Sequence, residues 1–232
     1  LQIDLAQSYC REKQWEDAKI AIERAVELNP NEASHLLALS DCLISMDDIT
    51  KAIQILERAA LLKPQDQRVL TALAEAHSKA ANHEAAHNVF IRAATLPSAN
   101  TNSEMNDYRA NRAFNLRRAG ESLWALQDKD QAIHLWKKAL RDAPGDVSVQ
   151  WQLGDALMSR GQHTEALEAF EAAAREDPAN PDFALAAAEA AVVLGELKRA
   201  QHHLKPITQS RLETSEPNYR LGRIYLSMGQ ND

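Results

Sequence analysis

One stretch of the sequence has residue types and spacing that suit catalysis by a metal ion. Residues 83–87 read HEAAH, so two histidines stand four residues apart and a glutamate follows the first. On a helix, His83 and His87 would share one face and could bind one Zn²⁺ ion, with Glu84 as general base. No convincing third ligand follows in an equivalent helix. We therefore favour a packing role and expect neither a metal site nor a cofactor.

No other group of residues suggests catalysis. The sequence has no Ser/His/Asp arrangement, no phosphate-binding loop and no cysteine cluster, and His134, His202 and His203 are scattered. Cys10 and Cys42 are too few for a disulfide framework, and we interpret both as packing residues. We expect no enzymatic activity from this segment.

The composition favours helices and argues against two classes of partner. The 232 residues include only 7 glycines, and the formal net charge is −7. No basic run or stripe is present, so nucleic acid is not an expected partner. No apolar run reaches the roughly 18 residues that a membrane span needs. The sequence begins in mid-pattern without methionine, as expected for a piece of a longer protein.

A helix-turn-helix pattern in residues 149–178 organises the sequence. Apolar and small residues share one face in each half, namely Leu153, Gly154 and Leu157 in the first and Ala166, Phe170 and Ala173 in the second. Gly161 marks the turn, and Pro178 ends the second helix.

The same pattern recurs in steps of 34 residues. It predicts six complete copies and one partial copy, at residues 1–32, 33–66, 67–100, 113–146, 147–180, 181–214 and 215–232. With Pro178 counted as position 32, position 8 is always Ala, Ser or Gly, and position 20 is Ala in all six complete copies. Small residues there let helix axes approach closely. Ala86 of HEAAH holds position 20, which supports its packing role.

About 12 residues, 101–112, interrupt the spacing before the fourth copy. They offer a capping box from Thr101 to Glu104, and apolar residues downstream keep a three-to-four spacing. We predict that the insert lengthens the first helix of the fourth copy, which then runs roughly from residue 102 to 127. In the sixth copy, Pro206 lies within the expected second helix and should kink it or end it early.

The recurring Leu-Gly, Ala, aromatic, Ala and Pro residues resemble the tetratricopeptide repeat family. The resemblance covers nearly the whole sequence. It implies an all-α, right-handed superhelical solenoid of helix-turn-helix repeats, forming one domain over residues 1–232. It also implies a non-catalytic scaffold that binds a protein or peptide partner.

In this family the first helix of each repeat lines a concave groove, with positions 2, 5, 9 and 12 facing it. Position 9 is acidic in five consecutive copies, as Asp41, Glu75, Glu121, Asp155 and Glu189. Such an acidic strip would attract a basic partner. The alternative is that these carboxylates pair with Arg68, Arg117 and Arg118 or stay hydrated. Ile3 and Gln7 stand where chaperone-tail binders carry Lys and Asn, so that function is not expected.

Large side chains on the same surface could anchor a partner, or could bridge adjacent repeats. The predicted binding residues are Arg117, Arg118, Glu121, Trp124, Trp151, Asp155, Met158, Glu189 and Tyr219.

Two other functions remain open. The segment could be the regulatory or substrate-docking arm of a larger enzyme, such as a glycosyltransferase or a peptidase. It could also self-assemble, because the final helix, with Leu221, Tyr225 and Leu226, has no second helix to cover it.

Overall fold

The computed structural model describes residues 5–6, 9–10, 12–97, 102–209 and 215–229. These residues form helices joined by short turns and contain no β-strand, which confirms the predicted all-α class. The helices are α2 (Trp15–Leu28), α3 (Ala33–Ser45), α4 (Ile49–Leu62), α5 (Gln67–Lys79), α6 (His83–Ala94), α7 (Asn102–Ala125), α8 (Lys129–Asp142), α9 (Val147–Ser159), α10 (His163–Glu176), α11 (Pro181–Val193), α12 (Leu197–Gln209) and α13 (Ser215–Ser227). None of these described helices has the length and apolar content needed to cross a membrane.

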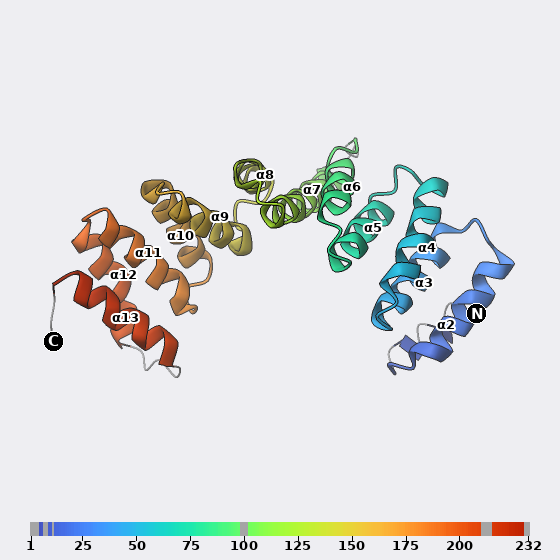
Figure 1. Ribbon diagram of the computed structural model, residues 1–232, viewed down its shortest axis with the longest axis horizontal. Helices are drawn as coiled ribbons and strands as arrows, with labels where there is room; N and C mark the ends of the chain where they lie inside the picture. The colour runs from blue at the N-terminus through green and yellow to red at the C-terminus, as the bar shows by residue number, and fades with distance from the viewer. Residues whose placement is uncertain (1–4, 7–8, 11, 98–101, 210–214, 230–232) are drawn as a thin grey trace. The chain divides into compact units, whose positions relative to one another are not determined.

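Within residues 15–125 and within residues 147–209, each helix packs against the next one along the chain (Figure 1). Helix α3 pairs with α4, α5 with α6, α9 with α10, and α11 with α12. The second helix of a pair also contacts the first helix of the following pair, as α4 does with α5 and α10 with α11. This order is the helix-turn-helix repeat that the sequence predicts.

The chain divides into two compact units, residues 1–135 and 136–232, with the division inside α8. The N-terminal unit has a core of buried residues from successive hairpins, including Leu36, Leu56 and Leu70. In the C-terminal unit, Leu157, Leu167 and Leu185 are fully buried. The single array over residues 1–232 stays a prediction.

Small residues allow the helices to pack closely. The six alanines at position 20 have no exposed surface: Ala18, Ala52, Ala86, Ala132, Ala166 and Ala200 are each 0% exposed. At position 8, Gly154 of α9 lies against the ring of Phe170 of α10, and a Cβ atom on Gly154 would come within 2.6 Å of Phe170 Cε1. The helix contact therefore depends on the absence of a side chain at residue 154.

The turn after the first helix of each copy has one residue with a left-handed backbone. The residue at position 15 has a positive φ between 57° and 75° in all seven copies: Lys13, Asp47, Ala81, Gln127, Gly161, Gly195 and Gly229. Only the last three are glycine, so the other four adopt a conformation that L-amino acids disfavour. The glycines are visible in the sequence as turn signals, whereas the other four are not.

The long helix α7 includes most of the insert. It runs from Asn102 to Ala125, against an expected range of about 102 to 127. The insert therefore continues the helix of the fourth copy instead of forming a loop. The predicted capping box depends on Thr101, which lies outside the described residues.

Helix α12 does not end early at Pro206, which corrects that part of the sequence prediction. It continues to Gln209. Leu204 and Ile207, on either side of the proline, are 0% and 4% exposed, so burial of this face holds the last turn in place. Pro206 has no backbone N–H, so the carbonyl oxygen of His202 lacks its helical hydrogen-bond donor. Because His202 is exposed, water can donate to this carbonyl instead.

Replacing Gly154 with alanine tests the close approach of α9 and α10. The new methyl would overlap the Phe170 ring, so we expect Gly154→Ala to lower the free energy of unfolding by about 1–2 kcal/mol. Gly222, at the same position of the last copy, is the matched control, because a Cβ atom added there would meet no described atom within 4 Å. Gly222→Ala should be neutral or raise stability by up to about 1 kcal/mol, because alanine favours helix. Urea unfolding followed by circular dichroism measures both, and equal effects would contradict the packing argument.

Candidate functional site

The HEAAH stretch serves helix packing. His83 begins α6, and Ala86 is fully buried. His87 Nδ1 lies 3.3 Å from the carbonyl oxygen of Ala119 on α7, so this ring links two neighbouring helices. Among the described residues, no three His, Cys, Asp or Glu side chains gather in a way that could hold a metal ion.

The acidic strip is partly neutralised in the N-terminal unit. Arg117 Nη1 and Arg118 Nη1 donate to the two carboxylate oxygens of Glu121, at 3.0 and 2.5 Å. All three side chains lie on α7 and are mostly buried. Glu121 thus pairs internally, as the alternative interpretation of the strip expects. Arg68 instead pairs with Asp66, which caps α5, at 3.2 Å.

In the N-terminal unit, Asp41 and Glu75 are the strip carboxylates without a described ion-pair partner. They lie on α3 and α5, two first helices that contact each other. Burial raises the pKa of Asp41, and the negative charge of Glu75 raises it further. No described basic side chain forms an ion pair with either carboxylate. This pair is therefore the part of the strip best suited to attract a positive group.

In the C-terminal unit, Arg220 of α13 binds the strip carboxylate Glu189. Its Nε and Nη2 atoms lie 3.2 and 3.3 Å from the two oxygens of Glu189, and its Nη1 lies 3.1 Å from Asp182. Arg220 thereby ties α13 to α11. Arg220 is not among the predicted residues, because only the packing of α13 on α11 brings it to Glu189.

A cavity of about 300 Å³ opens beside this ion pair in the C-terminal unit. The first helices α9, α11 and α13 line it with apolar side chains, Met158, Val192, Val193 and Ile224, and with the polar residues Glu189, Arg223 and Ser227. Val193 is 56% exposed, so the apolar lining is accessible from solvent. The predicted residues Met158 and Glu189 meet here, whereas Val192 and Val193 were not predicted.

The predicted aromatic anchors differ in their surroundings. Trp151 is half-buried, and its ring centroid lies 5.4 Å from that of Phe170 and 5.3 Å from that of Phe183. It therefore bridges two adjacent repeats. The Trp124 ring faces the Lys129 ammonium at 5.0 Å. Tyr219 is 64% exposed, with the Arg223 guanidinium 5.9 Å from its ring.

The nine predicted binding residues fall into two sets. Arg117, Arg118, Glu121 and Trp124 belong to the N-terminal unit, and Trp151, Asp155, Met158, Glu189 and Tyr219 belong to the C-terminal unit. That all nine residues line a single groove stays a prediction. Ile3 and Gln7, on which the argument against a chaperone-tail binder depends, lie outside the described residues.

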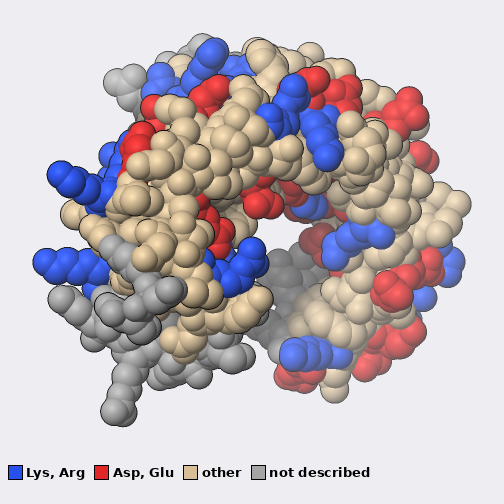
Figure 2. Space-filling view, turned by 60° about the vertical axis from the view of Figure 1, so that its left-hand side comes forward, with Lys and Arg blue, Asp and Glu red and all other residues tan. Residues whose placement is uncertain are grey.

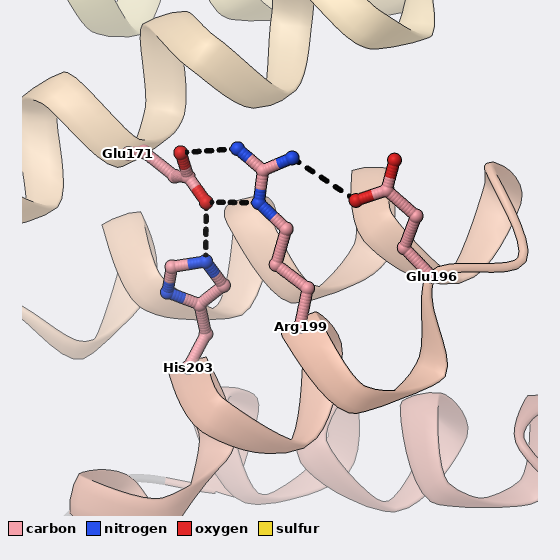
Figure 3. A network of polar contacts seen from close by, with 4 residues as sticks. All are labelled: Glu171, Glu196, Arg199 and His203. Carbon is pink, nitrogen blue, oxygen red and sulfur yellow. Dashed lines mark hydrogen bonds and ion pairs between the residues drawn. The ribbon is translucent and has the colours of Figure 1, made fainter.

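Glu171, Arg199, His203 and Glu196 form a cluster of charged side chains that links α10 and α12 (Figure 3). Two Arg199 nitrogens donate to the two Glu171 oxygens at 2.7 Å. His203 Nε2 lies 2.8 Å from Glu171 and must donate, because a carboxylate only accepts. Burial would raise the pKa of Glu171, but the hydrogen bonds from Arg199 and His203 outweigh it and lower that pKa. A carboxylate held in this way is a weak base, so the cluster suits packing of the two helices.

Acidic and basic side chains are interspersed over the described part of the face drawn in Figure 2. No broad area there is covered by Lys and Arg alone, which agrees with the charge pattern of the sequence.

Two protein-family models match the sequence, and both are described as tetratricopeptide repeat. One covers residues 117–181, and the other covers residues 11–76 and 157–217. Together they span most of the described repeats in both units. No curated protein matches the sequence.

Solved structures share the fold at low sequence identity. PilF of Pseudomonas aeruginosa superposes with a TM-score of 0.70 and 18% identity, over 96% of each chain. MamA gives a TM-score of 0.64 at 20% identity, over 76% of this chain and 90% of its own. YrrB, described as a TPR protein with an unusual peptide-binding site, gives 0.61 at 19% identity, over 80% and 89%. Identities this low show the fold and nothing more.

Removing the Glu171 charge tests the link between α10 and α12. The pKa of Glu171 in the folded protein lies below its ordinary value of 4.5, so the charged carboxylate stabilises the fold at pH values above 4.5. This stabilisation is lost as the pH falls through the folded-state pKa. We expect Glu171→Gln to lower the free energy of unfolding by about 1–2 kcal/mol at pH 7, and by much less near pH 3. The control is Glu168→Gln, an exposed glutamate on the same helix. Denaturant unfolding at both pH values measures the difference, and a loss that does not depend on pH would contradict this account.

Proposed function

Since this chain belongs to the tetratricopeptide repeat family, we propose that it is a non-catalytic interaction module that binds a segment of a partner protein on its first helices. The observation that carries the proposal is the open, largely apolar cavity of about 300 Å³ on α9, α11 and α13. The peptide-binding site described for the structural neighbour YrrB adds support by analogy.

The cavity suits an apolar side chain of the partner. Met158, Val192 and Ile224 provide an apolar lining, and methionine adapts its shape to different ligands. Arg223 and Ser227 at the same cavity can hydrogen-bond to a nearby main chain. Exposed Tyr219, on the same helix as Arg223, offers an additional aromatic contact.

Asp41 and Glu75 in the N-terminal unit suit a basic group of the partner. Burial, and then the negative charge of Glu75, raise the pKa of Asp41, and an incoming Lys or Arg would relieve the repulsion between the two carboxylates. This supports the expectation of a basic partner, restricted to the part of the strip that Arg117, Arg118 and Arg220 do not neutralise.

The docking-arm hypothesis uses the same surfaces. If the chain is a segment of a larger enzyme, these subsites would hold a substrate protein or regulate the enzyme. The sequence on either side of residues 1–232 in the full protein distinguishes this role from that of an independent adaptor.

Self-association is a second candidate function, because α13 has an exposed apolar face. Tyr219 and Leu226 are 64% and 66% exposed, whereas Ile224 and Met228 are buried. An isologous pair of such helices would bury this face. Light scattering at two protein concentrations tests it: a particle mass that stays monomeric at both rejects self-association.

A charge placed in the apolar cavity should weaken partner binding. Peptides selected from a displayed random library on the wild-type protein provide the probe, and fluorescence polarisation provides their dissociation constants. We expect Val193→Asp to raise the dissociation constant about tenfold or more, because the carboxylate must lose water when an apolar side chain binds. The control is Ile20→Asp, since Ile20 is 54% exposed and lies on α2 in the other unit. If Val193→Asp binds the peptides as tightly as wild type, the cavity is not the site.

Neutralising the acidic pair should weaken binding of basic peptides in a salt-dependent way. We expect the double variant Asp41→Asn with Glu75→Gln to lose about three- to tenfold in affinity at low salt and to respond less to added salt than wild type. It should stay folded, because it removes a repulsion. The control is Glu84→Gln, an exposed glutamate on α6. Selected peptides without basic residues, or an unchanged salt response, would exclude this subsite.

A further inference from the structure

The two cysteines of the sequence line one cavity in the N-terminal unit. The cavity measures about 390 Å³, and its lining includes Cys10 from the helical residues before α2, Trp15 of α2, and Asp41 and Cys42 of α3. Both cysteines are thiols, and Cys10 packs against the buried cluster that contains Cys42. The sequence separates these residues widely, so their meeting is a result of the fold.

The two thiols differ in accessibility. Cys42 is 1% exposed, and its S–H group donates to the carbonyl oxygen of Trp15 at 3.2 Å. Cys10 is only partly buried. A dissolved oxidant therefore reaches Cys10 first, and Cys42 can react only with a group already attached at Cys10.

Burial raises the pKa of Cys42 to about 11, and the nearby Cys10 thiol adds to the shift. Charged groups also surround Cys42: Glu16 raises this pKa and Lys19 lowers it, both from α2, and Asp41 lines the same cavity. Cys42 is thus almost entirely protonated at neutral pH. It is inert toward oxidants alone, and its thiolate becomes available as the pH rises.

We propose that Cys10 and Cys42 form an oxidisable dithiol, which exchanges with a small-molecule disulfide such as oxidised glutathione to give an intramolecular disulfide. In the first step the Cys10 thiolate attacks one sulfur of oxidised glutathione, which forms a mixed disulfide and releases one glutathione thiolate. In the second step the Cys42 thiolate attacks the Cys10 sulfur, which closes the protein disulfide and releases the second glutathione thiolate. Two protein thiols are oxidised, and one glutathione disulfide is reduced to two thiols.

Closure requires a small rearrangement within the cavity. Cys42 must exchange its hydrogen bond with Trp15 for a bond to the Cys10 sulfur, which lines the same cavity. The new bond would tie the helical residues before α2 to α3, the helix that carries Asp41. Oxidation would therefore stiffen the first hairpins next to the acidic pair.

The experiment treats the folded protein with oxidised glutathione and follows its intact mass after acid quenching. We expect a transient mixed disulfide, followed by a product lighter than the starting protein by two hydrogens. Because Cys42 reacts as its thiolate, the closure rate should rise about tenfold per pH unit between about pH 7 and 9. Circular dichroism at each pH confirms that the protein stays folded, and the closed product should unfold at a higher temperature than the reduced protein.

Two variants assign the roles of the sulfurs. Cys42→Ser should stop at the mixed disulfide on Cys10, and Cys10→Ser should not react while it remains folded. The proposal is overturned if the wild-type mixed disulfide persists at pH 9, if the disulfide joins two chains, or if closure occurs only in denaturant. The wild-type measurement decides the matter even if a variant fails to fold.

Discussion

The close approach of paired helices at alanine and glycine positions is the contact on which the rest of the structure depends. The six position-20 alanines have no exposed surface, and Gly154 lets the Phe170 ring lie directly against the α9 backbone. A single hairpin cannot bury its apolar face alone, so each pair is stable only against its neighbours. Both helices of a pair contribute buried residues to this packing, and binding is proposed on the exposed side chains that the first helices retain.

The acidic residues at position 9 are not equivalent, although the sequence repeats them regularly. Glu121 has arginines three and four residues before it on the same helix, and both bind it. Glu189 meets Arg220 only because α13 packs on α11. Asp41 and Glu75 have neither kind of partner, so their repulsion persists in the fold. Whether a repeated carboxylate is neutralised therefore depends on the residues around it in the fold. The sequence shows only the neighbours that lie within one helical turn.

Much of the fold could be predicted from the sequence, because its signals are local. The apolar spacing after residue 102 gave the extended helix α7 almost to the residue, and the recurrent alanines gave the hairpin packing. The prediction from local sequence was wrong where tertiary packing outweighs it. Pro206 was expected to end α12 early, but burial of Ile207 keeps the last turn helical. The bridging of Phe170 and Phe183 by Trp151, and the meeting of Cys10 with Cys42, also depend on distances between helices. Residue spacing along one helix cannot specify such distances.

The left-handed residue at the turn of every hairpin has a consequence for how the protein opens. Lys13, Asp47, Ala81 and Gln127 hold a backbone conformation that costs an L-residue about 1–2 kcal/mol, whereas Gly161, Gly195 and Gly229 adopt it freely. Transient local opening of the first four hairpins should therefore require less free energy. Their amide hydrogens should exchange with solvent sooner than those of the later hairpins. We therefore expect the hairpins that carry the acidic pair and the two cysteines to open more readily than those with a glycine at this position.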